Sequence, residues 1–300
     1  NSYASNRSLM RDAQQQPSKE EPDVASIIDG TATDGPLSYQ VGLVTDPGEL
    51  PVCGGSLIAP RVVLTAAHCL IDEDYTPIDP PLNKVLINGY DLATGVIPDD
   101  SGYVAASSYV VHPDYNSTTF ENDIALWFLP FPIGEDEHFK FATLNEDPTV
   151  PADGEELFVS GWGYTVDGDP FSQSLILLGT NVDYVTNKQC QSDYDKRNDT
   201  ITDELMCAAR DGTDACQGDS GGPLVIANGT APAMNPPVQV GIVSWGDGCA
   251  DPDFPGVYTR VSSYIDWIHS TACQEVGELC PSSSKSGKGK SKAYKSESGP

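Results

Sequence analysis

Three short segments of the chain carry residue types that could perform covalent chemistry. GDSGGP, residues 218–223, surrounds the hydroxyl of Ser220 with small residues, and chance rarely supplies such a run. TAAHC, residues 65–69, places His68 after an apolar stretch, and ENDIAL, residues 121–126, places Asp123 at the start of another. A histidine beside a cysteine, or an aspartate at a strand edge, is usually structural when it stands alone. Their combination with the serine segment favours a nucleophile that has its own base.

The chemistry of a serine nucleophile requires each of these groups. A serine hydroxyl is a weak nucleophile at neutral pH, so a neighbouring base must take its proton during attack. His68 suits this role, because an unperturbed histidine pKa of about 6.5 leaves the ring mostly neutral above pH 7. Asp123 would hold the ring in the required tautomer. The backbone amides of Gly218 and Ser220 would form an oxyanion hole.

In the order His, Asp, Ser, these segments resemble the chymotrypsin–trypsin family of serine proteases, and most closely the trypsins. Subtilisin-like enzymes and α/β-hydrolases carry the same roles in other orders. The resemblance runs from about Ile27 to Thr271 and includes four further segments: HPDYN (112–116), SGWG (160–163), VSWGDGC (243–249) and PGVYTRV (255–261). It implies a secreted serine endopeptidase, a hydrolase that acts through an acyl-enzyme intermediate with His68, Asp123 and Ser220 as its catalytic residues. Its partners would be protein or peptide substrates and protein inhibitors.

The elements that must position these residues read as strands. Short apolar runs separated by turn residues predict an all-β protein; these runs are 39–44, 62–67, 84–88, 124–128, 157–162, 223–227 and 238–245. The spacing of apolar residues in 261–271 predicts a closing helix. The resemblance implies two antiparallel six-stranded β-barrels with a C-terminal α-helix and the active site between the barrels.

The two ends of the chain differ from this body. Residues 1–26 are polar and lack periodicity, so we expect a propeptide or a disordered arm. The protease domain is expected over residues 27–272, followed by a disulfide-closed loop over 273–280. Residues 281–300, rich in serine, lysine and glycine, are expected to form a disordered tail.

The resemblance also implies which side chain the enzyme cuts after. Asp214, six residues before Ser220, matches the floor of the family's primary pocket. A carboxylate buried there needs a cation, so the substrate should present Arg or Lys. Gly246 and Gly256 match the two wall glycines that admit a long side chain. Trp245 and Gly246 would pair with the substrate backbone as an added strand, and Phe120 would border the neighbouring subsite.

Eight cysteines and four N-x-S/T sequons together favour an oxidising, extracellular compartment. The sequons make four asparagines glycosylation candidates: Asn6, Asn116, Asn198 and Asn228. Eight cysteines allow 105 pairings. The resemblance implies four of them: Cys53–Cys69, Cys190–Cys207, Cys216–Cys249 and Cys273–Cys280. The calcium loop of vertebrate trypsins has no convincing match between residues 88 and 100, so we expect no metal and no cofactor.

Activation is where the chain departs from its family. The resemblance implies a zymogen in which a new N-terminal Ile27 inserts into the body and pairs with Asp219. Relatives usually carry Arg or Lys before this isoleucine, whereas this chain has Ser26. A different activating protease, or trimming after a first cut at Arg11 or Lys19, is therefore needed. The alternative function is a protease-like binding protein that remains a zymogen.

The charge of the chain excludes some partners. Sixteen Lys and Arg stand against 44 Asp and Glu, a net charge of −28, and five of the lysines lie in residues 281–300. Such a body should repel nucleic acid and anionic membranes and attract cationic substrates. No run of about 18 apolar residues occurs, so we expect no membrane span. The family default is a monomer.

Overall fold

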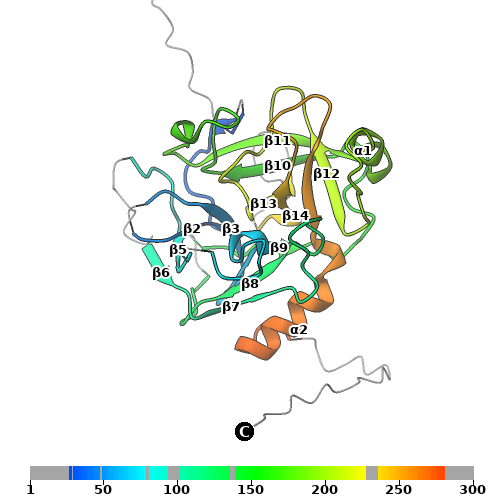
Figure 1. Ribbon diagram of the computed structural model, residues 1–300. Helices are drawn as coiled ribbons and strands as arrows, with labels where there is room; N and C mark the ends of the chain where they lie inside the picture. The colour runs from blue at the N-terminus through cyan, green and yellow to red at the C-terminus, as the bar shows by residue number, and fades with distance from the viewer. Residues whose placement is uncertain are drawn as a thin grey trace, which may run out of the picture.

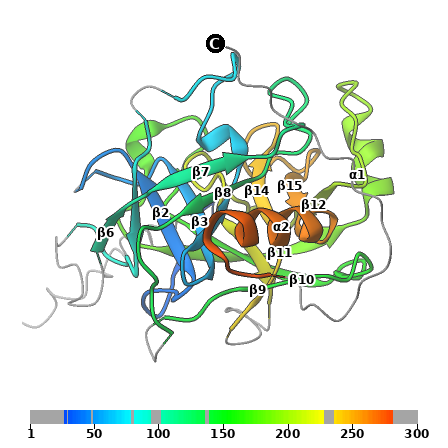
Figure 2. The same ribbon diagram turned by 90° about the horizontal axis from the view of Figure 1, so that it is seen from below.

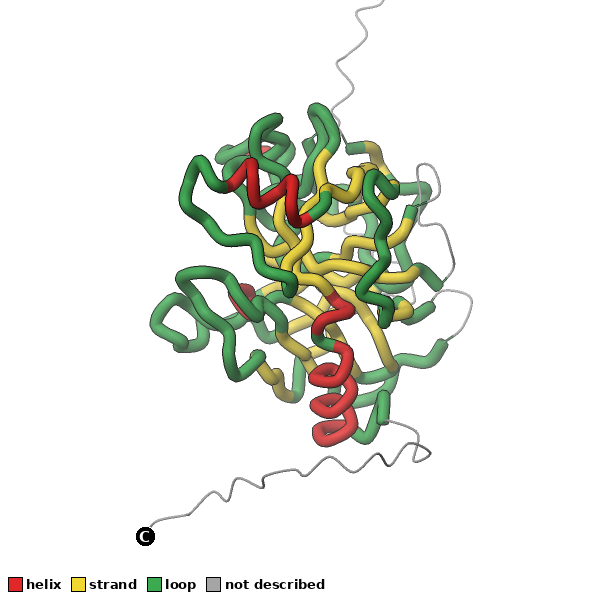
Figure 3. Tube along the Cα trace, turned by 90° about the vertical axis from the view of Figure 1, so that its right-hand side faces the viewer, coloured by secondary structure: helices red, strands yellow, loops and turns green. Residues whose placement is uncertain are grey.

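The computed structural model describes residues 27–280, apart from 29, 48, 79–80, 94–101, 136–138 and 228–235. Most of its strands form two sheets, one from each half of the chain. In Figure 1 the sheet of the first half lies below the sheet of the second half. In side view the strands occupy the middle of the molecule, loops surround them, and one helix projects at the lower edge (Figure 3). The propeptide and tail predicted for residues 1–26 and 281–300 lie outside the described residues.

The sheet of the first half curls without closing within the described residues. Its seven strands follow one another in the order β6 (Gly102–Ala105), β5 (Lys84–Ile87), β2 (Gln40–Val44), β3 (Cys53–Ala59), β4 (Val62–Thr65), β8 (Ala125–Phe128) and β7 (Ser108–Val111). Every residue of β3, β4 and β8 is buried. Such continuous burial explains why the segments of β4 and β8 read as apolar runs that do not alternate, whereas β3, which contains two glycines and a serine, was not predicted.

The sheet of the second half closes into a barrel of six strands. Its members follow one another as β11 (Leu178–Val185), β10 (Glu156–Gly161), β13 (Pro223–Ile226), β14 (Val238–Trp245), β15 (Gly256–Arg260) and β12 (Leu205–Ala209), and β12 pairs back with β11. Two short strands attach to this barrel: β1 (Thr31–Ala32) beside β11, and β9 (Thr143–Leu144) parallel to β14.

These two sheets and a C-terminal helix confirm the chymotrypsin-like fold. The first half differs in detail from the six-stranded barrel expected, because it has seven strands and its outer strands β6 and β7 each pair with one neighbour among the described residues. The residues of both outer strands are at least partly exposed, although Val104 of β6 and Val110 and Val111 of β7 pack against the apolar core.

The closing helix α2 (Ile265–Val276) begins after a short 3₁₀ turn, η3 (Val261–Ser263), and packs against β8 (Figure 2). Its buried Ile268 and Ala272 belong to the same apolar core as β8, so the last helix of the second half covers the first half. The helix runs five residues beyond the predicted end at Thr271. It stops at Gly277, whose φ of 72° allows the left-handed cap. Cys273 therefore lies inside the helix and not in a loop after it.

Three further short helices connect the strands. They are η1 (Ala67–Cys69), η2 (Pro170–Ser172) and α1 (Asn187–Tyr194). The sequence did not predict α1, because only Cys190 and Tyr194 of its eight residues are buried and no apolar stripe marks it. Within the described residues, no helix combines the length and the apolar character needed to cross a membrane.

Candidate active site

His68 and Asp123 come together from two elements of the first sheet. His68 lies in η1 directly after β4, and Asp123 lies two residues before β8, which pairs with β4. Asp123 Oδ2 is 2.8 Å from His68 Nδ1, and Asp123 Oδ1 accepts the backbone amide of His68 at 2.9 Å. The carboxylate thus holds both the ring and the main chain of the histidine, which leaves Nε2 for a substrate-side role.

The charges of this pair stabilise each other. Burial alone would lower the pKa of His68, but the charge of Asp123 and its hydrogen bond raise it above the ordinary value. Burial alone would raise the pKa of Asp123, but His68 and the hydrogen bonds that the carboxylate accepts lower it. The aspartate is therefore ionised, and the histidine is a stronger base than a free imidazole.

The second half of the chain also holds Asp123, through two residues that the sequence analysis did not assign. Ser244 Oγ in β14 donates to Asp123 Oδ2 at 2.5 Å, and Thr259 Oγ1 in β15 donates to the carbonyl oxygen of Asp123 at 2.8 Å. Both donors are buried. Ser244 lies directly before Trp245 inside the VSWGDGC segment, so that segment was the available signal. These bonds fix the acid across the interface between the two sheets.

Ser220 lies on the loop before β13, beside the histidine turn. Its carbonyl oxygen accepts the amide of Gly54 at 2.7 Å and lies 3.5 Å from Cys69 Sγ, and the same sulfur is 3.9 Å from His68 Nε2. The next residue, Gly221, has a φ of 78°, and a β-carbon there would lie 2.2 Å from Thr65 Oγ1. Only glycine permits this approach of the serine loop to the histidine strand.

The amides expected to form an oxyanion hole are unpaired. Within the described part of the chain, neither the amide of Gly218 nor that of Ser220 donates a hydrogen bond. Gly218 has a φ of 96°, which turns its peptide into a conformation that glycine favours. Asp219 between them points the other way and is fully buried. Two amides on either side of Asp219 are thus available, within the described residues, for an anionic oxygen beside Ser220.

Asp219 is a buried acid without a cation. Its carboxylate accepts the amides of Gly163 at 2.8 Å and Cys216 at 2.9 Å, and the described residues place no basic group against it. Burial raises the pKa of Asp219 to about 7, although the two amides oppose this. Ile27 is also fully buried, and Ile28 pairs with Asp214 as an isolated β-bridge. The predicted activation segment therefore lies against the walls of the site.

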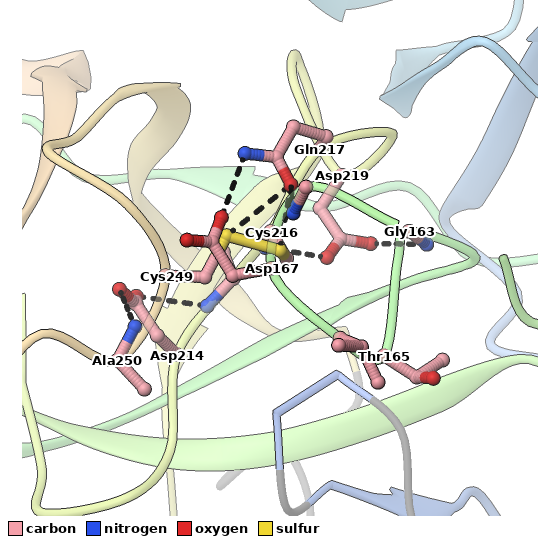
Figure 4. Close-up of a disulfide and its surroundings, with 12 residues drawn as sticks. Gly163, Thr165, Asp167, Asp214, Cys216, Gln217, Asp219, Cys249 and Ala250 are labelled. Carbon is pink, nitrogen blue, oxygen red and sulfur yellow. Dashed lines mark hydrogen bonds between the residues drawn. A yellow bond between two sulfur atoms is a disulfide. The ribbon is translucent and has the colours of Figure 1, made fainter. Parts of the chain in front are cut away.

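A pocket opens beside Ser220 between two segments of the second half. It has a volume of about 220 Å³, and its lining includes residues 214–217, Ser220, 243–246, 248–249 and 256–258. Gly246 and Gly256 face each other across it: a β-carbon on Gly246 would lie 4.0 Å from the α-carbon of Gly256. The Cys216–Cys249 disulfide joins the two walls (Figure 4).

Asp214 lies at the base of this pocket and is 5% exposed. Its carboxylate accepts the amides of Ala215 at 2.8 Å and Ala250 at 3.1 Å (Figure 4), and a β-carbon on Gly256 would lie 2.9 Å from Oδ1. Burial raises the pKa of Asp214 to about 7, against the effect of the two amides. The hydroxyl of Tyr258, also in the lining, is buried without a partner. The pocket thus offers polar groups that a cation would satisfy.

The remaining predicted residues occupy the surroundings of the site. All four predicted disulfides are present: Cys53–Cys69, Cys190–Cys207, Cys216–Cys249 and Cys273–Cys280. Phe120 packs edge-on against the ring of His68, with centroids 5.8 Å apart. Of the sequons, Asn116 is half-buried and Asn198 exposed, whereas Asn6 and Asn228 lie outside the described residues. The two groups of three possible metal ligands found in the described residues each contain both sulfurs of a disulfide, which have no thiolate to bind a metal.

Two β-sheets whose junction holds the hydrogen-bonded His68 and Asp123, with the loop of Ser220 beside the histidine turn, form the arrangement of the chymotrypsin-like fold. The sequence profile described as Trypsin matches residues 27–268. The chain is 38% identical over 247 residues to Trypsin Blo t 3 of Blomia tropicalis, covering 81% of this chain and 84% of that protein. It is 38% identical over 222 residues to a trypsin of Squalus acanthias, covering 73% and 85%. It is 35% identical over 238 residues to a tryptase of Mus musculus, covering 77% and 82%. The chain belongs to the trypsin family of serine endopeptidases.

Proposed function

We propose that this endopeptidase is secreted as a zymogen and cleaves peptide bonds after Arg or Lys. The observation that carries the specificity is Asp214, a nearly buried carboxylate at the base of a pocket that opens beside Ser220. A guanidinium or ammonium entering this pocket would compensate a charge that only two amides now stabilise. The small faces of Gly246 and Gly256 leave room for a side chain of that length.

In the proposed mechanism, Ser220 Oγ attacks the carbonyl carbon of the peptide bond while His68 Nε2 takes the hydroxyl proton. Asp123 keeps Nδ1 protonated and stabilises the imidazolium. The amides of Gly218 and Ser220 stabilise the tetrahedral oxyanion, and each such donor is worth about 2.7–4 kcal/mol. His68 then returns the proton to the leaving amine, and the acyl-enzyme is hydrolysed by water that the same histidine activates.

Activation follows from the second buried acid. Cleavage between Ser26 and Ile27 creates an ammonium that pairs with Asp219, whose charge is otherwise uncompensated. The complete burial of Ile27 and the bridge between Ile28 and Asp214 support this, because they bring the new terminus to the pocket wall. Asp214 cannot bind Ser26, so another protease makes this cut, or the end is trimmed after a first cut at Arg11 or Lys19.

Four disulfides support secretion, since such bonds persist in oxidising, extracellular compartments. Asn116 is half-buried and Asn198 is exposed, so both side chains have surface to which a glycan could be attached. Carbohydrate on either asparagine is therefore part of the proposal.

The specificity is tested by comparing kcat/KM on peptides that differ only in Arg, Lys or Phe at the cleaved position. We expect Arg to be preferred over Lys, because the planar guanidinium can form two hydrogen bonds to Asp214. A second reason is that Ala215 supplies no hydroxyl to solvate an ammonium. Phe should be cleaved poorly, and benzamidine should inhibit competitively. A preference for Phe would refute the assignment of the pocket.

A further inference from the structure

A second carboxylate lies beside the pocket, against two of its lining residues. Asp167, on the exposed segment between β10 and β11, has a carboxylate oxygen within 4.8 Å of both sulfurs of the Cys216–Cys249 disulfide. Its Oδ1 accepts a hydrogen bond of 3.1 Å from Nε2 of Gln217, as Figure 4 shows beside the disulfide. Gln217 is a lining residue of the pocket that holds Asp214. The two acids therefore flank the bridge that joins the pocket walls.

The other oxygen of Asp167 is turned toward the opposite wall. A β-carbon on Gly248, another lining residue, would lie 3.2 Å from Asp167 Oδ2. Gly248 has no side chain, so the space beside this oxygen is not filled by one. Asp167 thus presents one oxygen that Gln217 holds and one that borders the rim.

The segment that carries Asp167 is fixed to the rim by several contacts. The amide of Tyr164 donates to the carbonyl oxygen of Gln217 at 2.7 Å, and the amide of Gly168 donates to Gln217 Oε1 at 3.5 Å. Asp167 lies between these two residues and adds its own bond to the Gln217 side chain. A carboxylate held in this way loses little conformational freedom when it binds a ligand.

Among the described residues, Asp167 also lacks a basic partner, unlike two acids on the segment after Gly246. Asp247, next to Gly246, forms an ion pair with Arg197, and Asp253 pairs with Lys196. Among the described residues, Asp167 has no such ion pair, and its hydrogen-bond donor is the neutral amide of Gln217. Its negative charge remains available to a cation that the substrate brings.

We propose that Asp167 is a specificity-determining residue that binds a second basic side chain of the substrate. This inference rests on the proposed cleavage after Arg or Lys. A substrate that pairs with Trp245 and Gly246 is extended, so its side chains alternate between two faces. The cleaved residue points into the pocket, and the residues two before and two after it share that face. A Lys or Arg at either position can reach the rim, whereas the intervening residues point away from it.

The test uses the activated enzyme and peptides with Arg at the cleaved position. Lys or Ala is placed two residues before, two residues after, or one residue before this Arg. Exposed ion pairs contribute about 0.2–1 kcal/mol, so we expect the ratio of kcat/KM for Lys to Ala to reach about 2 to 5 at one or both same-face positions. The ratio should stay near 1 at the opposite-face position and fall toward 1 everywhere in high salt.

Asp167→Asn should abolish the preference at the same-face positions. Asp153→Asn is the matched control, because it removes the same charge from an exposed aspartate before β10 and should keep the preference. Retention of the preference in Asp167→Asn would overturn the inference, as would an equal loss in both variants. Cleavage after Arg with no preference for Lys at either same-face position would overturn this inference alone. Failure to cleave after Arg would overturn the proposed function as well.

Discussion

Three buried aspartates in this site have different partners, and their pKa values differ accordingly. Asp123 faces a histidine, and its pKa lies below the ordinary range. Asp214 and Asp219 have only amide donors, and burial raises the pKa of each to about 7. In the proposed enzyme these two acids receive cations from outside the folded body, namely the substrate side chain and the ammonium of Ile27. The same residue type thus serves as a permanent anion in one place and as a receptor for a cation in two others.

The raised pKa of Asp214 predicts that benzamidine binding depends on pH. The amidinium binds the ionised carboxylate, and the empty pocket holds more of the protonated acid as pH falls through about 7. The affinity for benzamidine should therefore decrease below about pH 7, by up to tenfold per unit. Calorimetric titration of the activated enzyme from about pH 5.5 to 8.5 measures this. Asp214→Asn should bind weakly and without that slope, and a constant affinity of the native enzyme over this range would contradict the prediction.

At the scale of elements, the seven predicted apolar runs all fall on strands, but the long strands β3 and β11 were not predicted. The strand β14 matches its predicted bounds, because β-branched residues recur along this segment between turn residues. The helix α1 is held by the Cys190–Cys207 disulfide and by Tyr194, whose contacts come from distant segments. The sequence of α1 has no periodic pattern of apolar residues from which such a helix could be predicted. The predicted helix likewise ended at Thr271, five residues before the observed end of α2 at Val276.

The sequence analysis assigned the residues expected to contact the substrate, but it did not assign the residues that support them. The segment GDSGGP singles out Ser220 by its composition, whereas His68, Asp123 and Asp214 were assigned through their order and spacing relative to it and the family resemblance that these carry. Ser244 supports Asp123 from the other sheet, 121 positions along the chain. Asp167 reaches Gln217 from 50 positions away. Both depend on how the elements pack, which composition and spacing do not encode.

The activation segment leads to a prediction about Ser26. Ser26→Arg should let the enzyme cut its own chain before Ile27, because Asp214 can bind the new arginine. The native chain should stay inactive under the same conditions. N-terminal sequencing together with the time course of activity on an Arg peptide measures both. Full activity of the native chain with an N-terminus other than Ile27 would contradict the role given to this residue.

The proposed ion pair between the Ile27 ammonium and Asp219 predicts an alkaline limit for the active form. Asp219 should raise the pKa of the Ile27 ammonium above its unfolded value of about 7.7–8. A group whose folded pKa is raised contributes its full stabilisation below the unfolded value and loses it as pH climbs through the folded one. Activity should accordingly fall on the alkaline side as the pair is broken.

At the scale of the whole molecule, the site exists because the two halves are held together. Asp123 belongs to the first sheet and bonds to β14 and β15 of the second, and α2 returns from the second half to cover β8. The net charge of −28 surrounds this interface with a negative field. Such a field should raise the rate at which cationic substrates arrive, and salt should reduce that effect.

Covalent labelling tests the central claim most directly. The activated enzyme is treated with a fluorophosphonate, and the modified residue is located by peptide mapping. We predict one label per chain, on Ser220, with loss of peptidase activity in proportion to labelling. Ser220→Ala should take no label and should lower kcat by roughly 10⁶ while retaining the fold. Label on another residue, or near-native cleavage by folded Ser220→Ala, would contradict the account.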